Sequence, residues 1–412
     1  MSGSTAKTKR AADKVRSLAN SAPYRHNRKH PFYQPVPRGF CSIPGVLAQD
    51  EWQVNNFDLL RLLAALQVAV VHALGVWKPP GYFGRLLGYA LDRFPGVPIF
   101  FVISGVLISK SYEHSDSLLD YLRNRCLRIF PGLWVCLAVS VVVILALGVD
   151  ALGPITAPAW LLWWAAQLSI FQSYQPTFLE PLSSGPLWGL NASLWTIPIE
   201  LEFYLALPAL YGILRLRKRR GDFYLLAVAL ASLAVQLLLV HGQRVGVQTR
   251  VYDWLLLTLV PYLWMFLVGV SIQRNWSSVR GWLVNRAHWW ALGYVLLSVA
   301  ANWLPGPAAS NNISPLFLLP LAGLIVSLAM SAPQLSDRLL RHQDISYGLY
   351  LYHMPVIGFL VGFAAPYGWT SFAATLVLSL GFAGLSWTLV EKKYLRRKRG
   401  ALREVSADGG VQ

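Results

Sequence analysis

Long apolar runs alternate with short polar segments along most of the chain. Each run approaches the ~20 residues that an α-helix needs to cross a bilayer. We expect ten membrane-spanning helices, over residues 57–77, 94–111, 129–149, 194–214, 223–241, 252–272, 287–304, 315–332, 346–364 and 369–390. A shorter apolar stretch at 159–171 contains Trp160, Trp163 and Trp164 and is typical of a re-entrant or interfacial helix. The predicted fold class is therefore an all-α polytopic membrane protein.

The distribution of cations predicts how these helices are oriented. With ten spans and both termini in the cytoplasm, the cytoplasmic segments contain 30 of the 36 lysines and arginines, and the outer segments contain five. Short cytoplasmic loops accumulate such residues. Counting 159–171 as an eleventh span would remove this asymmetry. We therefore expect ten spans, with a basic, disordered cytoplasmic arm at 1–55, one membrane domain at 56–394 and a basic cytoplasmic tail at 395–412.

Composition agrees with a membrane protein and narrows the partners. Apolar residues make up 55% of the 412, and charged residues only 13%, against about 25% in soluble domains. This excludes a disordered or fibrous protein and disfavours a soluble enzyme. The net charge of +17 comes from cytoplasmic segments, so we expect no nucleic-acid partner. Three cysteines give neither a disulfide framework nor a zinc spacing, and we expect no metal.

Ionisable side chains inside the first predicted span are candidates for function, because burying them in a bilayer is costly. Asp58, Arg61 and His72 all lie in this span. Arg61 and His72 are eleven residues apart, which places them on one helix face about 16 Å apart along the axis. A neutral imidazole in apolar surroundings can act as a general base. The simpler alternative is that Asp58 and Arg61 reach the interface or pair, while His72 is a satisfied interior histidine.

Six short segments, in order along the chain, resemble the motifs of the membrane-bound acyltransferase 3 family. They are Arg61-x10-His72, Pro98–Ile108, Arg125-x-x-Arg128 with Pro131, Leu194–Glu200 with Phe203-Tyr204, Ser346–Pro355 and Ser386 to Glu391. The resemblance covers residues 57–394. Two departures occur: leucines flank Arg61 where the family often has glycine, and Lys393 replaces a common proline.

The resemblance implies an enzyme that moves an acyl group, commonly acetyl, from cytoplasmic acyl-CoA to a hydroxyl of an envelope or exported glycan. It implies a multi-pass protein of the bacterial plasma (inner) membrane that modifies polysaccharide. Its partners would be acyl-CoA as co-substrate, a glycan or glycolipid acceptor and the bilayer, with no permanently bound cofactor.

The same resemblance suggests roles for the polar residues. His72 would be the general base or, alternatively, a transiently acylated nucleophile, and Arg61 would clamp the donor. Glu200 would orient His72 or bind a sugar hydroxyl. Arg125 and Arg128 would hold the donor phosphates, although both could equally be ordinary positive-inside anchors. Substrate-binding candidates with weaker support are Asp58, Trp195, Tyr204, Tyr350, His353 and Glu391.

Helix geometry limits the roles of two candidates, and two other functions are alternatives to acyl transfer. Glu202 lies ~200° from Glu200 around a helix, so both cannot face one site. His353 precedes Pro355 by two residues and could simply satisfy a carbonyl freed by the proline. A proton-coupled carrier or glycan flippase would use His72, Glu200 and His353 as a proton relay, whereas a glycan polymerase would need a basic outer loop, and 150–193 contains no Lys or Arg.

Overall fold

The computed structural model describes residues 55–146, 192–214, 221–246, 249–303, 311–332, 334–341 and 343–395, with isolated positions 161, 165, 166 and 169. All regular structure in this part of the chain is helical, as predicted, and it includes no strand. The predicted basic arm, the basic tail and the interfacial helix at 159–171 lie almost entirely outside the described residues.

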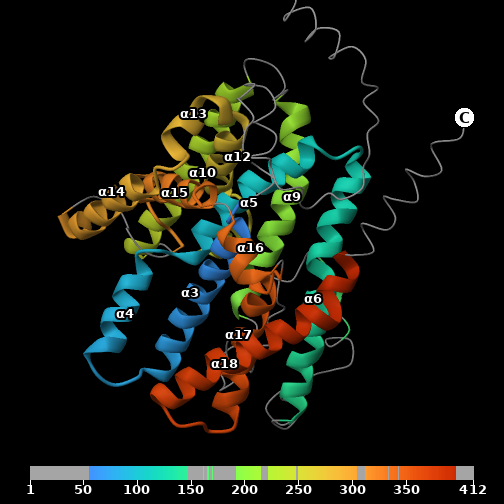
Figure 1. The fold of residues 1–412 in the computed structure, drawn as a ribbon, viewed down its shortest axis with the longest axis vertical. Helices are drawn as coiled ribbons and strands as arrows, with labels where there is room; N and C mark the ends of the chain where they lie inside the picture. Colours follow the sequence, from blue (N-terminus) through green and yellow to red (C-terminus); the bar gives the residue numbers. More distant parts are fainter. Residues whose placement is uncertain are drawn as a thin grey trace, which may run out of the picture. The chain divides into compact units, whose positions relative to one another are not determined.

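The helices are labelled in Figure 1. In chain order they are α3 (Phe57–Trp77), α4 (Tyr82–Asp92), α5 (Gly96–Glu113), α6 (Leu118–Ala146), η3 (Ala192–Trp195), α9 (Thr196–Ile213), α10 (Gly221–Arg244), α11 (Arg250–Leu256), α12 (Leu263–Arg274), α13 (Trp276–Leu283), α14 (Ala287–Val299), η4 (Ala300–Trp303), α15 (Pro315–Met330), α16 (Leu335–Leu340), α17 (Ser346–Gly362), α18 (Trp369–Ser386) and the π-helical turn η5 (Trp387–Glu391).

Within the described residues, five helical stretches are long and apolar enough to cross a membrane. They are Phe57–Trp77, Tyr82–Glu113, Leu118–Val143, Gly221–Arg244 and Trp369–Leu395. In α18, Ser371, Thr375 and Ser379 are buried on one stripe, whereas Val377 and Leu385 are exposed. A helix of a soluble protein buries its large apolar side chains and exposes its polar ones, so α18 has the reverse pattern. The protein is therefore an integral membrane protein.

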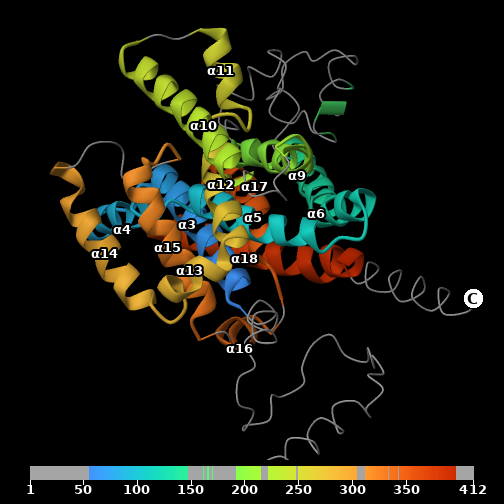
Figure 2. The ribbon, with the colours of Figure 1, turned by 90° about the horizontal axis from the view of Figure 1, so that it is seen from above.

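The centre of the bundle is formed by α3, α5 and α17. Figure 2 shows them between α14 on one side and α6 on the other. α12 packs along α5, and α18 along α17. α5 and α12 approach so closely that a Cβ on Gly105 would lie 2.0 Å from the Phe266 carbonyl oxygen, and one on Gly269 2.1 Å from that of Val102. Only glycine fits at either position.

The close approach of α5 and α12 gives a prediction about stability. Gly269→Ala should lower the thermal unfolding temperature, because the two helices must separate to admit the methyl group, at a cost of about 1–3 kcal/mol. Gly381→Ala in α18 is the matched control, since nothing lies within 4 Å of its Cβ position, and it should be neutral or stabilising. Equal unfolding temperatures for the two variants in detergent would contradict this packing.

The ends of α3, α17 and α18 fix their relative directions. At the end of α3, the Trp77 carbonyl accepts a hydrogen bond from Gly368 N at 3.0 Å, and Trp77 Nε1 donates to Thr375 Oγ1 at 2.8 Å. Trp369 Nε1 donates to the Pro80 carbonyl at 3.1 Å. The end of α3 therefore meets the start of α18. Because α17 leads into α18 at this same end, α3 and α17 run in the same direction, and α18 runs back in the opposite direction.

The sequence predicts one continuous helix over residues 252–272, and this prediction is wrong. The structure divides the segment into α11 and α12. The break between them is stabilised by two polar side chains. Glu202 Oε2 accepts a hydrogen bond from Leu259 N at 2.6 Å. Ser232 Oγ donates to the Val260 carbonyl at 2.6 Å and accepts from Trp264 N at 3.0 Å. These contacts satisfy backbone groups that a helix break leaves free. Hydropathy alone cannot show such a break.

The third predicted span, 129–149, begins eleven residues too late. α6 starts at Leu118, where Ser117 Oγ accepts a hydrogen bond from Asp120 N at 3.1 Å and donates to Asp120 Oδ2 at 2.7 Å. This contact caps the first turn. Arg125 and Arg128 consequently lie within a continuous helix, which holds both side chains at defined positions.

Candidate active site

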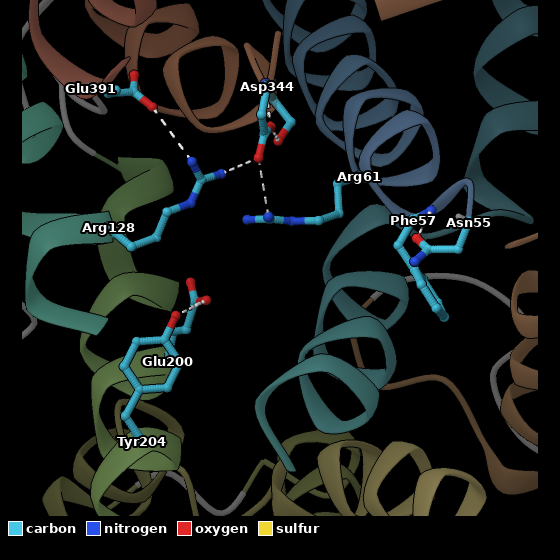
Figure 3. A network of polar contacts seen from close by, with 9 residues as sticks. Asn55, Phe57, Arg61, Arg128, Glu200, Tyr204, Asp344 and Glu391 are labelled. Carbon is cyan, nitrogen blue, oxygen red and sulfur yellow. Dashed lines mark hydrogen bonds and ion pairs between the residues drawn. The ribbon is translucent and has the colours of Figure 1, made fainter. Parts of the chain in front are cut away.

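Two arginines from different helices share one carboxylate at the end of the bundle where α3 begins. Arg61 of α3 donates through Nη1 to Asp344 Oδ2 at 3.3 Å, and Arg128 of α6 forms an ion pair with the same oxygen through Nη2. Figure 3 shows the two guanidinium groups pointing toward each other, with Asp344 between them. The side chains retain only 13–18% exposure. The two positive guanidinium groups are therefore poorly screened by solvent, and the shared Asp344 carboxylate offsets their mutual repulsion.

Asp344 is itself fixed by the start of α17. Its Oδ1 accepts hydrogen bonds from Ser346 Oγ at 2.5 Å and from Ser346 N at 3.3 Å. Burial by itself would raise the pKa of Asp344, but Arg128, Arg61 and the two bonds from Ser346 outweigh it and hold the pKa below its usual value. Asp344 therefore stays ionised between the arginines.

Glu391 lies behind Arg128. Its side chain is 2% exposed, accepts a hydrogen bond from Ser386 Oγ at 3.0 Å and has Oε2 3.9 Å from Arg128 Nη1. It belongs to the π-helical turn η5, a rare geometry that often occurs at functional sites. The turn places Glu391 where it can position the Arg128 guanidinium.

Two adjoining cavities begin at this arginine pair. Both are lined by Arg61, Ser104 and Glu200. The first has a volume of about 180 Å³, and its lining includes the polar side chains of Arg125, Arg128, Tyr204 and Asp344 beside four isoleucines and leucines. The second holds about 30 Å³ and is lined by more apolar groups that include Phe100, Thr196, Tyr347 and Tyr350. An arginine-rich chamber thus continues into a narrow, mainly apolar passage.

Glu200 lies where the two cavities meet. Its Oε1 accepts a hydrogen bond from the Tyr204 hydroxyl at 2.5 Å, one helical turn further along α9, as Figure 3 shows. The guanidinium of Arg125 stacks over the Tyr204 ring, 5.7 Å from its centroid. Glu202 points elsewhere, to Leu259, which confirms that the two glutamates do not face one site.

His72 and His353 form a hydrogen-bonded pair between α3 and α17. His72 Nδ1 lies 2.8 Å from His353 Nε2, and the rings are nearly parallel, at 16°. His353 Nδ1 lies 2.7 Å from the Tyr350 carbonyl oxygen. A carbonyl only accepts, so His353 carries its proton on Nδ1 and its Nε2 accepts from His72 Nδ1. When both rings are neutral, His72 Nε2 therefore has a free lone pair.

Tyr350 links the histidine pair to the apolar passage. It lines that passage, and its ring centroid lies 5.9 Å from that of His353. Its hydroxyl donates to the Ser193 carbonyl at 2.6 Å and lies 2.6 Å from Thr196 Oγ1. These bonds fix the Tyr350 ring at the start of α9. One side of Tyr350 thus faces the cavity, and the other faces the histidines.

The structure arranges the predicted site residues in two groups, and α3 contributes one residue to each group, Arg61 to the first and His72 to the second. Arg125, Arg128, Glu200 and Tyr204 gather with Arg61 around the first cavity, and Tyr350 and His353 gather with His72. The shared face of Arg61 and His72 is confirmed, because Arg61 contacts Asp344, just before α17, and His72 contacts α17 itself.

Two expectations about individual contacts need correction. Arg61 pairs with Asp344 rather than with Asp58, which is exposed at the start of α3. The side chain that holds His72 is His353 rather than Glu200, because His353 lies one hydrogen bond away. Trp195, a substrate-binding candidate, packs against Tyr262 with ring centroids 5.5 Å apart, and its role stays a prediction.

Sequence reasoning missed Asp344 because it lies between predicted spans, where a lone acid looks like ordinary loop polarity. The available signal was its position two residues before Ser346, at the start of a helix rich in tyrosine. Among the described residues, no group of three His, Cys, Asp or Glu side chains could hold a metal ion.

Fold and site together define a polytopic membrane protein with an arginine-lined chamber and a hydrogen-bonded histidine pair between two central helices. A family model described as an acyltransferase domain, Acyl_transf_3, matches residues 54–390. The chain therefore belongs to the acyltransferase 3 family and is an acyltransferase of groups other than aminoacyl groups.

Similar proteins agree with this assignment. The chain is 34% identical to Nodulation protein 10 of Rhizobium leguminosarum bv. viciae over 358 residues, covering 83% of this chain and 93% of that protein. It is 26% identical to an O-acetyl transferase of Shigella phage Sf6 over 362 residues, covering 83% and 96% respectively. No solved structure matches the chain. Membership of an enzyme family favours catalysis over the carrier and flippase alternatives.

Proposed function

We propose that this protein transfers an acetyl group from cytoplasmic acetyl-CoA to a hydroxyl of a glycan, with His72 as general base. The observation that carries this proposal is the arrangement of α3. One face of this helix presents Arg61 to a cation-rich chamber and, three turns further, a histidine whose Nε2 is unprotonated. The name of the Sf6 relative, O-acetyl transferase, supports the acetyl group.

Phosphate binding is the role that the chamber supports for Arg61, Arg125 and Arg128. Guanidinium groups bind phosphate through paired N–H donors. Asp344 accepts from only one nitrogen of Arg61 and one of Arg128, so further donors of both arginines remain available to a ligand. The chamber is lined by three arginines and two acids, Asp344 and Glu200, which leaves it one positive charge to attract an anionic donor.

The narrow passage suits the thioester arm of the donor. It leads from Arg61 to Tyr350 between mainly apolar walls, and Tyr350 contacts the histidine pair. At about 30 Å³ the passage has room for only a water or two, so an uncharged pantetheine chain would have to widen it on entry while the phosphates stay in the chamber. The reacting carbonyl would then lie on the Tyr350 side, within reach of an acceptor beside His72.

The chemical step follows from the tautomer of His72. Its Nε2 accepts the proton of the acceptor hydroxyl as the oxygen attacks the thioester carbonyl carbon. The tetrahedral intermediate then collapses, the C–S bond breaks, and the imidazolium returns the proton to the thiolate of coenzyme A. His353 accepts the bond from His72 Nδ1 throughout and holds the ring in this tautomer, much as a carboxylate does in a catalytic triad.

We further propose that the chain crosses the inner membrane of a bacterium ten times, with both termini in the cytoplasm. The cation distribution supports this orientation, as does the position of Arg61, Arg128 and Asp344 at one end of the bundle. Lys78 and Trp369 lie at the other end. The donor would enter from the cytoplasm, and the acceptor from the outer half of the membrane.

Purified protein and labelled acetyl-CoA test the proposed function. We expect label to pass to a glycan or glycoside acceptor with release of free coenzyme A, measured by thiol titration. Retention of all label on acetyl-CoA with every glycan and glycoside offered would contradict the proposal.

The tautomer argument predicts a graded effect at His353. His353→Leu should lower kcat roughly 10²-fold. Without His353, the Nδ1–H of His72 has no acceptor, so nothing keeps the proton on Nδ1 and leaves Nε2 free to act as the base. His353→Gln should restore part of the rate, since a Gln Oε1 can lie near the Nε2 position. KM for acetyl-CoA should stay unchanged in both variants. Equal rates for Leu and Gln would show that His353 only fills space.

A further inference from the structure

A third cavity lies between α3 and the short helix α4. Its volume is about 630 Å³. The wall on α3 includes Val71, Leu74 and Gly75, and the wall on α4 includes Gly84 and Gly88. Figure 1 shows α4 running back alongside α3 after the turn at Pro79 and Pro80. We call this cavity the α3–α4 groove.

The walls of the α3–α4 groove suit an alkyl chain. A Cβ on Gly75 would have nothing within 4 Å, and one on Gly88 only a Leu74 methyl at 3.7 Å, so the glycines leave open space between the helices. On α4, Tyr82 is 70% exposed and Phe83 64% exposed. Such a helix contacts hydrocarbon, where no water is present to fill an apolar groove.

Two cations lie where the groove meets the end of α3. Lys78 and Arg85 both line it, and both are exposed. Neither side chain forms an ion pair or hydrogen bond with another described residue. The acid that lines the groove, Asp92, follows Arg85 by two helical turns, about 10 Å along α4. One end of the groove is therefore positive, and the remainder is mainly apolar.

We propose that the α3–α4 groove binds the lipid anchor of the acceptor, a lipid phosphate that carries the sugar to be acylated. The alkyl chain lies between α3 and α4, and the phosphate lies between Lys78 and Arg85. This complementarity of chain and charge is that of an anionic lipid. The proposal rests on the proposed function and adds the class of acceptor.

The position of the groove relative to His72 supports this assignment. Lys78 follows His72 by six residues on α3, an axial distance of about 9 Å. Val71 and Gly75, on either side of His72 in sequence, line the groove. A sugar attached to a phosphate at Lys78 can therefore reach the depth of His72, while the donor approaches from the Arg61 end of the same helix.

Two acceptors with the same sugar separate lipid recognition from chemistry. Protein in phosphatidylcholine nanodiscs receives labelled acetyl-CoA and either a polyprenyl phosphoryl glucose or uncharged octyl glucoside. For Lys78→Glu/Arg85→Glu, we expect kcat/KM with the phosphoryl lipid to fall roughly 10- to 30-fold, because each cation near a lipid phosphate contributes modestly. The rate with octyl glucoside should stay within about twofold of wild type.

Gly75→Leu tests the same groove without changing charge. The Leu side chain would occupy the space that the alkyl chain needs, and nothing lies within 4 Å of its Cβ position, so the variant should fold. It should show the same selective loss. Arg244→Glu, an exposed cation at the end of α10, is the control and should leave both acceptors unaffected.

Lipid binding measured by native mass spectrometry distinguishes failure of this proposal from failure of the proposed function. Charge reversal should weaken binding of the polyprenyl phosphoryl glucose by roughly the same 10- to 30-fold, whether or not acetyl transfer occurs. Unchanged binding, or an equal loss of rate with both acceptors, would overturn the groove assignment. Loss of phosphatidic acid binding with unchanged acceptor kinetics would show a structural lipid site and would overturn it too.

Discussion

Replacing His72 by alanine is expected to reduce acetyl transfer by 10² to 10⁴-fold, the range that a general base contributes. The reason is that His72 Nε2 is the unprotonated end of the His72–His353 pair. Binding of coenzyme A should be unchanged, because Arg61 lies three turns away on α3 and the other two arginines of the chamber, Arg125 and Arg128, lie on α6. Transfer is measured with labelled acetyl-CoA and binding by calorimetry.

The control for His72→Ala is His241→Ala, an exposed histidine at the end of α10, which should retain full activity. If His72→Ala retained activity while folded, His72 would not be the base.

Mass spectrometry of wild-type protein incubated with acetyl-CoA alone distinguishes a general base from an acylated nucleophile. An acetylated His72 would indicate a covalent intermediate, and unmodified protein would support direct transfer.

Replacing Asp344 by asparagine is expected to destabilise the protein by about 3 kcal/mol, because it leaves two nearly buried guanidinium groups facing each other without their anion. The value is at the lower end for buried pairs, since the side chains keep 13–18% exposure. Coenzyme A should raise the unfolding temperature of Asp344→Asn more than that of wild type. Its phosphates would replace the missing charge.

Asp222→Asn is the matched control, because Asp222 pairs with Arg274 but is 50% exposed. It should cost less than about 1 kcal/mol. Equal costs for the two variants would argue against the buried arginine pair. Equal stabilisation of Asp344→Asn and wild type by coenzyme A would argue against a phosphate site.

The pH dependence of the free energy of unfolding is a second test of the ion pairs that Asp344 forms with Arg61 and Arg128. The pKa of Asp344 is lower in the folded protein than in the unfolded chain. Asp344 therefore contributes stability above the unfolded pKa, near 4, and this contribution is lost as the pH falls through the folded value. Wild type should lose stability below about pH 4 more steeply than Asp344→Asn.

The site shows which contacts a sequence can predict. Spacing along one helix predicts a shared face, because helical geometry is local, and Arg61 and His72 do face the same neighbour. The partners of these residues, Asp344 and His353, lie 283 and 281 positions further along the chain. No local rule predicts a pairing at that separation, and a single loop aspartate carries no periodic signal.

The sequence by itself determined the membrane class, the start and end of α3, and the residues whose burial in a bilayer is costly, because these depend on local hydropathy and helical period. Only the tertiary structure decided that Asp344 bridges two arginines, that His353 sets the tautomer of His72, and that Glu202 and Ser232 stabilise a break before α12. Each of these depends on side chains brought together by packing between distant helices.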